Sequence, residues 1–130
     1  MSVNSAVHAG QVQTPEQVQI FDVGPKAVGK GHVAVSVNSE SLMVLTHVWE
    51  SGGEVGLHSH HSTSAAWIVL QGKVKFYGEG DTVMADLGRG GGVYIPKNTK
   101  YWFESTGDEP LIMSRTVAKV EGVFDDRVFF

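Results

Sequence analysis

Short runs of alternating apolar and polar residues, separated by glycine-rich turns, make up most of the chain. In the first clear run, Val33, Val35 and Val37 alternate with two small residues. Further runs are rich in Val, Ile, Tyr, Phe and Trp, and they lie at residues 43–49, 66–70, 74–77, 93–95, 101–104 and 111–117. β-branched and aromatic residues in period-two alternation are typical of half-buried strands. No stretch of ten or more residues shows a convincing helical period, so the pattern predicts an all-β sandwich or barrel.

The chain has the length of one domain, and no internal boundary is visible. It has 130 residues, of which 42% are hydrophobic, which is enough for one core. Residues 1–17 are polar and aperiodic, and we expect them to form a flexible N-terminal arm, loosely ordered or laid across a neighbouring subunit. The barrel is expected to take residues 18–130. Its apolar C-terminal residues are expected to dock on the barrel or on a partner, and they are Phe124, Val128, Phe129 and Phe130.

Composition narrows the classes of function. The chain has no cysteine, which excludes disulfide scaffolds, thiolate zinc sites and cysteine nucleophiles, and which fits a reducing cytoplasm. The formal net charge is −4 and no basic run is present, so we expect no nucleic-acid partner. Residues 1–13 have neither a positive n-region nor a long apolar stretch, so we expect no signal peptide and no membrane segment. A cytoplasmic protein with a small-molecule partner is the expectation.

A pair of histidines stands at the centre of the most informative motif. Gly52 is followed after five residues by His58 and His60, after four more by Ala65, and after six more by Gly72. Residues two apart on a strand share a face, so the two imidazoles are expected to converge on one point. This spacing resembles the first motif of the cupin family, in which a glycine, a His-x-His pair, a glutamate and a second glycine follow one another at these intervals.

A second block follows after a plausible spacer. Gly90 precedes Pro96 by six positions, and Asn98, Tyr101 and Ser105 follow. This block is similar to the second cupin motif, which has Gly, His and Asn at the last three positions. Asn98 replaces the glycine of the motif, and this change is mild because glycine and asparagine both tolerate left-handed backbone. The resemblance covers roughly residues 40–118 and implies an all-β, single-domain cupin, a double-stranded β-helix or jelly-roll barrel with a pocket inside.

The resemblance also implies one divalent transition metal, such as Fe, Mn, Ni or Zn. In the family the two motif-1 histidines, the glutamate and the motif-2 histidine bind it. Here Ala65 stands at the glutamate position and Tyr101 at the last histidine position, so His58 and His60 are left as expected ligands. Protein metal sites usually need three or more protein ligands. A hydrogen-bonded pair without metal is the alternative interpretation of the two histidines.

Three further residues are candidates to complete such a site. If the register of the family holds, Tyr101 faces the same interior. A tyrosinate can bind iron, and a pocket tyrosine that hydrogen-bonds a ligand is its alternative role. A bulge would turn His61 inward, whereas a regular strand would leave it facing solvent. His47 shares a strand face with Trp49, and a satisfied core or surface histidine is its alternative role.

Aromatic residues are expected to shape the pocket. Trp67 lies two residues after the alanine of the first motif and shares its face. Together with Trp49, Tyr101 and Phe103 it is expected to line an apolar pocket for a small organic molecule, or else to fill the barrel core. Arg115, like Arg89, is a candidate anchor for an acidic substrate, with a surface position as the alternative.

These features predict a metal-dependent enzyme that acts on a small carbonyl, enol or carboxylate substrate, with His60 and Tyr101 as catalytic residues. Cupins include dioxygenases, lyases, decarboxylases, isomerases and cyclases, and the resemblance does not choose among them. One alternative is a metal-free acid–base isomerase, because a buried imidazole titrates near neutrality. Another is a non-catalytic binding or sensing module. A homodimer is expected, because cupins often pair through N-terminal strands.

Overall fold

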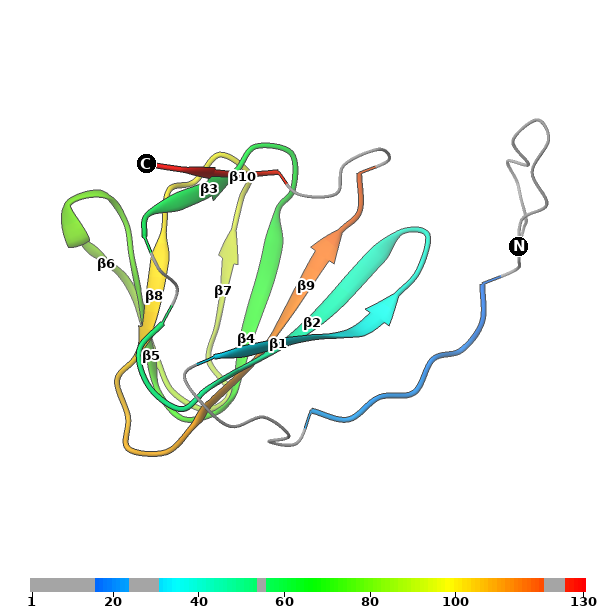
Figure 1. Cartoon of the computed structure of the whole chain (residues 1–130), viewed down its shortest axis with the longest axis horizontal. Coiled ribbons are helices and arrows are strands. Elements are labelled where there is room, and N and C mark those ends of the chain that lie inside the picture. The colour runs from blue at the N-terminus through cyan, green and yellow to red at the C-terminus, as the bar shows by residue number, and fades with distance from the viewer. Residues whose placement is uncertain (1–15, 24–30, 54–55, 121–125) are drawn as a thin grey trace.

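The computed structural model describes residues 16–23, 31–53, 56–120 and 126–130. Within these ranges the chain forms ten strands and one short 3₁₀ turn (Figure 1). They are β1 (His32–Asn38), β2 (Leu42–Trp49), β3 (His58–His60), β4 (Ala65–Gln71), β5 (Val74–Tyr77), η1 (Glu79–Asp81), β6 (Val83–Leu87), β7 (Gly92–Ile95), β8 (Trp102–Ser105), β9 (Leu111–Ala118) and β10 (Arg127–Phe129). The all-β prediction is therefore confirmed. No helix of the described residues is long and apolar enough to cross a membrane.

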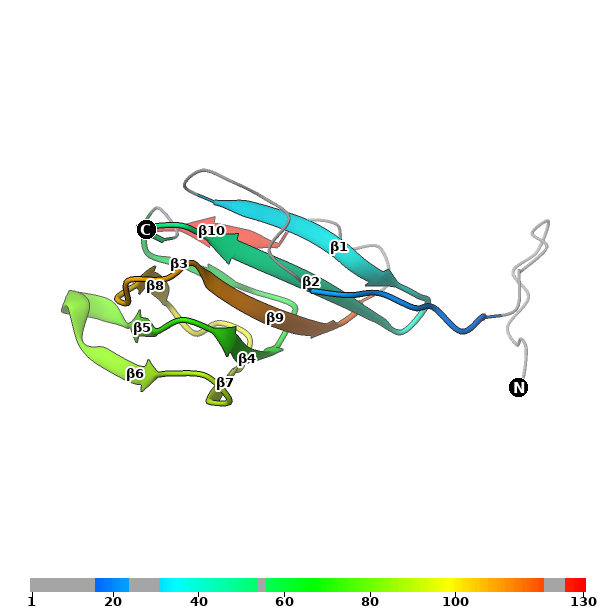
Figure 2. The same ribbon diagram turned by 90° about the horizontal axis from the view of Figure 1, so that it is seen from below.

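One wall of the molecule is a five-stranded antiparallel sheet in the order β1-β2-β9-β4-β7. Strand β4 shows how its sequence sets its faces. Ala65, Trp67 and Val69 are buried, whereas Ala66 and Ile68 are exposed. Because side chains alternate along a strand, the first three point into the interior and the other two outward. Figure 2 shows β1, β2 and β9 side by side in this twisted layer.

The opposite wall consists of a three-stranded sheet, β6-β5-β8, and a two-stranded sheet, β10-β3. A backbone bridge joins them, in which the N–H of His58 donates to Tyr101 O at 3.1 Å and the N–H of Tyr101 donates to His58 O at 2.8 Å. The bridge continues the second wall from β8 into β3. The two walls enclose the core, as a double-stranded β-helix requires.

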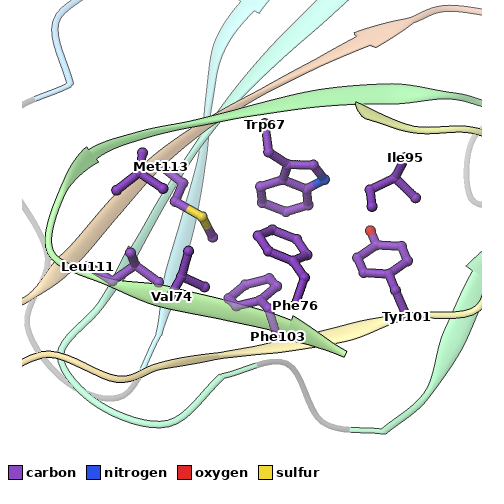
Figure 3. Packing of buried hydrophobic residues seen from close by; sticks show 9 residues of the cluster. Trp67, Val74, Phe76, Ile95, Tyr101, Phe103, Leu111 and Met113 are labelled. Carbon is purple, nitrogen blue, oxygen red and sulfur yellow. The ribbon is translucent and has the colours of Figure 1, made fainter. Parts of the chain in front are cut away.

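Apolar side chains fill one end of the space between the walls (Figure 3). We call this region the packed end, and it consists of Val69, Val74, Phe76, Phe103, Leu111 and Met113, all of them at most 1% exposed. The rings of Phe76 and Phe103 lie 5.4 Å apart, and each also contacts Trp67. Trp67 and Tyr101 belong to the same core cluster and also line the pocket that adjoins it.

Two motif positions, one with a replaced residue and one with the retained glycine, have the left-handed backbone that glycine favours. Asn98, which stands where the motif has glycine, has a φ of +68°. Gly72 has a φ of +85°, and a Cβ there would lie 3.0 Å from Leu111 Cα, so this turn accepts glycine alone without strain. The turn at Asn98 also supports the site, because its N–H donates to His60 O at 2.7 Å.

The C-terminal residues dock on the barrel. Strand β10 pairs with β3, opposing Phe129 to His58 and Arg127 to His60, and the N–H of Phe130 donates to Leu57 O at 3.0 Å. Phe124 and residues 1–15 of the predicted arm lie outside the described residues, and the homodimer stays a prediction. The docked strand matters for function because it brings the last residues of the chain against the histidine pair.

Candidate functional site

A pocket of about 680 Å³ occupies the interior between the two walls beyond Trp67 and Tyr101. We call this region the open end. It is lined by Val33, Met43, Leu45, His47, Trp49, His58, His60, Thr63, Trp67, Tyr101, Arg115, Val117, Lys119, Val120, Asp126, Arg127 and Phe129. Its size suits a small organic molecule. Most of the lining is apolar, and a few polar groups are placed on it from both walls.

The histidine pair of β3 faces this pocket, as the two-residue spacing predicted. The ring centres of His58 and His60 lie 5.4 Å apart, and Tyr101 lies 4.5 Å from the first and 6.2 Å from the second. His58 Nδ1 lies 3.2 Å from Gly56 O. In Figure 3 the hydroxyl of Tyr101 points across the interior toward the strand that carries Trp67. Strand β3 and the bridge to Tyr101 thus gather two imidazoles and a phenol on one wall.

A buried carboxylate supports the second histidine. Asp126, immediately before β10, has its Oδ1 2.7 Å from His60 Nδ1. Its Oδ2 accepts hydrogen bonds from the Ser62 N–H at 2.9 Å and the Thr63 hydroxyl at 2.8 Å. Both oxygens of the carboxylate are therefore engaged, and the aspartate is held in one orientation. A His–Asp pair with an anchored carboxylate fixes the orientation and tautomer of the imidazole.

Burial and charge decide the protonation states of this pair. Burial lowers the pKa of His60 below its usual value of 6.5, although the hydrogen bond to Asp126 opposes this change. Burial alone would raise the pKa of Asp126, but hydrogen bonds from His60, Ser62 and Thr63 outweigh it and lower the pKa to about 2. At neutral pH the pair is thus a neutral imidazole and a carboxylate. The carboxylate accepts, so His60 carries its proton on Nδ1 and its lone pair on Nε2.

On the opposite wall, His47 also lines the pocket. It is 6% exposed, and neither of its ring nitrogens has a hydrogen-bond partner among the described residues. Its ring lies 4.7 Å from Trp67 and 6.1 Å from Phe103. Burial, followed by the charge of Arg115, lowers the pKa of His47 to about 3, so it is neutral at physiological pH. It faces the pocket but lies on another wall than the β3 pair.

Two predicted site residues lie outside the lining. Phe103 is fully buried in the packed end, where it supports His47 and Trp67 from below. His61 is exposed in the bend that directly follows β3, and its Nδ1 donates to Asp126 O at 2.9 Å, so the ring does not turn into the pocket. Trp49 and Trp67 do line the pocket.

Sequence reasoning missed two features of the site. Asp126 carries no local signal, because it lies 66 positions from His60 and reaches it only through the pairing of β10 with β3. Arg115 was considered as an anchor, and the signal for its inward position was present. Arg115 lies two residues from the buried Met113 and two residues from the buried Val117, and a period-two pattern places all three side chains on one face.

The residues present do not fit the metal site that the family resemblance implies. No group of three or more His, Cys, Asp or Glu side chains within the described ranges is placed to hold an ion. Ala65 offers only a methyl group at the glutamate position, and both oxygens of Asp126 are already bonded within the protein. His58, His60 and the phenol of Tyr101 remain on one wall. Two imidazoles fall short of the usual donor number, and a phenol with an ordinary pKa near 10 is a poor third ligand.

Comparison with known proteins places this geometry in a family. The Cupin domain family matches residues 44–117, which is more than half of the chain. No curated protein matches the sequence.

Solved structures agree with the family match in their fold. A conserved uncharacterised protein with a double-stranded β-helix domain from Klebsiella pneumoniae subsp. pneumoniae MGH 78578 is 19% identical with a TM-score of 0.71, over 87% of this chain and 97% of that chain. Pac13, described as a unique nucleoside dehydratase, is 18% identical with a TM-score of 0.66, over 88% and 92%. KdgF from Halomonas sp. is 15% identical with a TM-score of 0.58, over 71% and 81%. These likenesses agree with the fold of two facing walls, and the match of the family model to residues 44–117 shows that the chain belongs to the cupin family.

Proposed function

We propose that this cupin is an acid–base enzyme that moves a proton on a small carbonyl compound bound in the barrel pocket, with His60 as the base. The observation that carries the proposal is the 2.7 Å contact between His60 Nδ1 and Asp126 Oδ1 at the pocket wall. A carboxylate behind an imidazole stabilises the imidazolium that forms when the other nitrogen takes a proton. This proposal keeps His60 and Tyr101 as catalytic residues.

The proposed step begins at a carbon next to the substrate carbonyl. His60 Nε2 takes a proton from this carbon, and the electron pair of the broken C–H bond moves toward the carbonyl oxygen. Tyr101 donates a hydrogen bond to that oxygen, which stabilises the charge of the enolate. Return of the proton to another position is an isomerisation. Loss of a β-hydroxyl group, with the proton from His60, forms a C=C bond and releases water.

The elimination branch draws support from one structural relative. Pac13 is described as a nucleoside dehydratase, and a variant from Streptomyces has been determined with uridine. Dehydration is a proton abstraction followed by loss of hydroxide, which is the chemistry that a neutral histidine backed by a carboxylate supplies. Because the identity is only 18%, this likeness suggests the class of reaction and leaves the substrate to experiment.

The metal-dependent enzyme predicted from the sequence is the alternative, and elemental analysis separates the two. Natively purified protein is compared with the double variant His58→Ala/His60→Ala. Less than about a tenth of an equivalent of any transition metal in both proteins supports the acid–base proposal. Near one equivalent of one transition metal in the wild type and none in the variant supports the metalloenzyme. The ion that restores the reaction rate after chelation is then the functional metal.

The test of the reaction uses ¹H NMR in D₂O. Enolisable 2-oxo acids and β-hydroxy ketones are incubated with the protein, and exchange of the protons next to the carbonyl and loss of water are followed. We expect catalysis by the wild type and a loss of at least about 100-fold in His60→Gln, as is usual for removal of a general base. His32→Gln, an exposed histidine of β1 outside the lining, is the matched control and is expected to keep the full rate.

The outcomes separate the three classes of function. Equal rates in the wild type and His60→Gln contradict the proposal. The absence of any exchange or elimination, in a protein that binds these compounds, favours the non-catalytic binding module.

A further inference from the structure

We propose that Arg115, with His47 and Trp67 beside it, forms an anion subsite on the pocket wall opposite the histidine pair, and that it binds a carboxylate or phosphate group of the pocket ligand. This inference names the substrate class of the proposed enzyme and rests on the proposed function in that respect. The subsite itself is a binding property, and it is testable without turnover.

The sheet register brings these side chains together. Arg115 on β9 pairs with Leu45 on β2 and with Trp67 on β4. His47 lies two residues further along β2, so it is a diagonal neighbour of Arg115 on the same inward face. The guanidinium carbon lies 5.6 Å from the Trp67 ring centre, and the His47 ring lies 4.7 Å from the Trp67 ring. The aromatic face thus holds the guanidinium inside the pocket.

Arg115 has no carboxylate partner in the described part of the chain, and its buried Nε has no hydrogen-bond partner there. Asp126 is the one acidic residue among the described residues of the lining, and its two oxygens are bonded to His60, Ser62 and Thr63. Arg115 is half-buried, and a partly buried cation without a partner is costly, so proteins pair such groups or use them to bind ligands. An arginine fork matches carboxylate and phosphate oxygens.

The other buried polar atoms near Arg115 are also nitrogens without hydrogen-bond partners. Both ring nitrogens of His47 and the indole N–H of Trp67 are buried without a partner among the described residues. An anionic group brings several acceptor oxygens, which suits the N–H groups of this wall. Neutral His47 has one N–H to donate, whereas the guanidinium supplies the charge.

The charge of the lining points to the same ligand class. Among the described residues, its cationic side chains are the half-buried Arg115 and the exposed Lys119 and Arg127, and its carboxylate is that of Asp126. The whole chain, in contrast, has a net charge of −4. In the described part of the lining, cationic side chains therefore outnumber carboxylates although the protein as a whole is acidic, which favours entry and binding of anions.

The subsite is also coupled to the base. The charge of Arg115 contributes to the lowered pKa of both His58 and His60, after burial as the main cause. A bound anion would compensate this charge, so it should raise the pKa of His60. A substrate whose anionic group lies at Arg115 would place its reacting carbon toward the opposite wall, where His60 and Tyr101 lie.

The experiment measures thermal unfolding with inorganic phosphate or malonate, against sodium chloride at equal ionic strength. Saturating anion is expected to raise the Tm of the wild type by about 3–6 °C. Arg115→Met should abolish the shift, and its Tm without anion should equal or exceed that of the wild type, because the unpaired cation is gone. Arg115→Lys keeps the charge without the fork, and we expect at least about tenfold weaker binding. Arg89→Met, exposed and outside the lining, is the matched control.

Each outcome bears on the subsite. A shift with phosphate alone or malonate alone supports it and identifies the group. No shift with either anion, an unchanged shift in Arg115→Met, or an equal loss in Arg89→Met would overturn it. So would a fall of several degrees in the Tm of Arg115→Met without anion, because Arg115 would then be a structural residue.

His60→Gln separates this proposal from the proposed function. If this variant keeps the anion shift while proton exchange is lost, both proposals hold. If the anion shift depends on Arg115 but exchange does not depend on His60, the subsite stands and the acid–base proposal fails. An NMR titration of His60 that shows a higher pKa with saturating anion in the wild type, but not in Arg115→Met, would confirm the coupling.

Discussion

The two ends of the barrel interior differ in how their side chains are satisfied. At the packed end, Phe76 and Phe103 pack against each other and against Trp67, and they contain no polar side-chain atom. At the open end, His47 and Arg115 have buried nitrogens without partners among the described residues, and Asp126 is fully bonded. The packed end therefore supplies stability, whereas the open end keeps polar groups whose lack of partners lowers stability, which is typical of a functional site.

The largest effect should come from damage to the packed end. Phe103→Ala removes a fully buried ring and is expected to cost about 3–5 kcal/mol of unfolding free energy. Leu45→Ala, a half-buried lining residue, should cost at most about 1–2 kcal/mol, because the pocket already adjoins it. Urea denaturation of both variants measures the difference, and equal losses would contradict the division into two ends.

Acid should destabilise the protein through the open end. The pKa of His47 is about 3 in the folded chain against 6.5 in the unfolded chain, so the unfolded chain binds the extra proton between these values. The stabilising contribution is complete above pH 6.5 and is lost as the pH falls, on the order of 3 kcal/mol by pH 4. His47→Leu should therefore flatten the fall of unfolding free energy between pH 6.5 and 4, whereas His32→Leu should leave it unchanged. Parallel curves for wild type and His47→Leu would refute this assignment.

A smaller effect is expected when the carboxylate behind His60 loses its charge. Asp126→Asn has a single amide oxygen for the Ser62 N–H and the Thr63 hydroxyl on one side and His60 on the other. The oxygen stays with Ser62 and Thr63, so the Nδ1–H of His60 loses its acceptor and the ring proton must move to Nε2. This change, with the loss of the charge-assisted hydrogen bonds, is expected to cost about 1–3 kcal/mol. Asp86→Asn, exposed on β6, is the control and should cost almost nothing. Thermal unfolding measures both variants, and equal stability of Asp126→Asn and the wild type would show that the carboxylate does not support the site.

The smallest effect concerns the turn beneath the histidine pair. Asn98 has a φ of +68°, so Asn98→Gly should change stability by less than about 0.5 kcal/mol, since glycine adopts this backbone freely. Asn98→Val should cost about 1–2 kcal/mol because a β-branched residue is strained there. An Asn98→Val variant as stable as the wild type would contradict the predicted strain and would mean that the turn relaxes. Hydrogen exchange of the residue-98 amide would then show whether its bond to His60 O is lost.

The sequence predicted what depends on short-range spacing. The two-residue interval of His58 and His60 placed both rings on one face, and the glycine position of the second motif predicted the left-handed backbone of Asn98. Which end of the barrel a residue occupies is not contained in such intervals. Phe103 alternates like a lining residue, yet its position along β8 places it in the packed end.

Long-range pairing explains the remaining gap between sequence and site. Asp126 reaches His60 only because β10 adds to β3, and no spacing within either segment predicts that meeting. For Arg115 the alternation of β9 predicts that the side chain points inward, but it does not predict which residues lie beside it. Its neighbours His47 and Trp67 come from two other strands whose register only the fold sets.

The most direct test of the acid–base account is the tautomer of His60, read from long-range ¹H–¹⁵N NMR spectra between pH 4 and 8. In the wild type we expect a proton on Nδ1, a lone pair on Nε2 and a titration midpoint below 6.5. In Asp126→Asn the amide oxygen is needed by Ser62 and Thr63, so its NH₂ group should donate to Nδ1 and move the ring proton to Nε2. A wild-type His60 protonated on Nε2, or a tautomer that is the same in both proteins, would contradict the account.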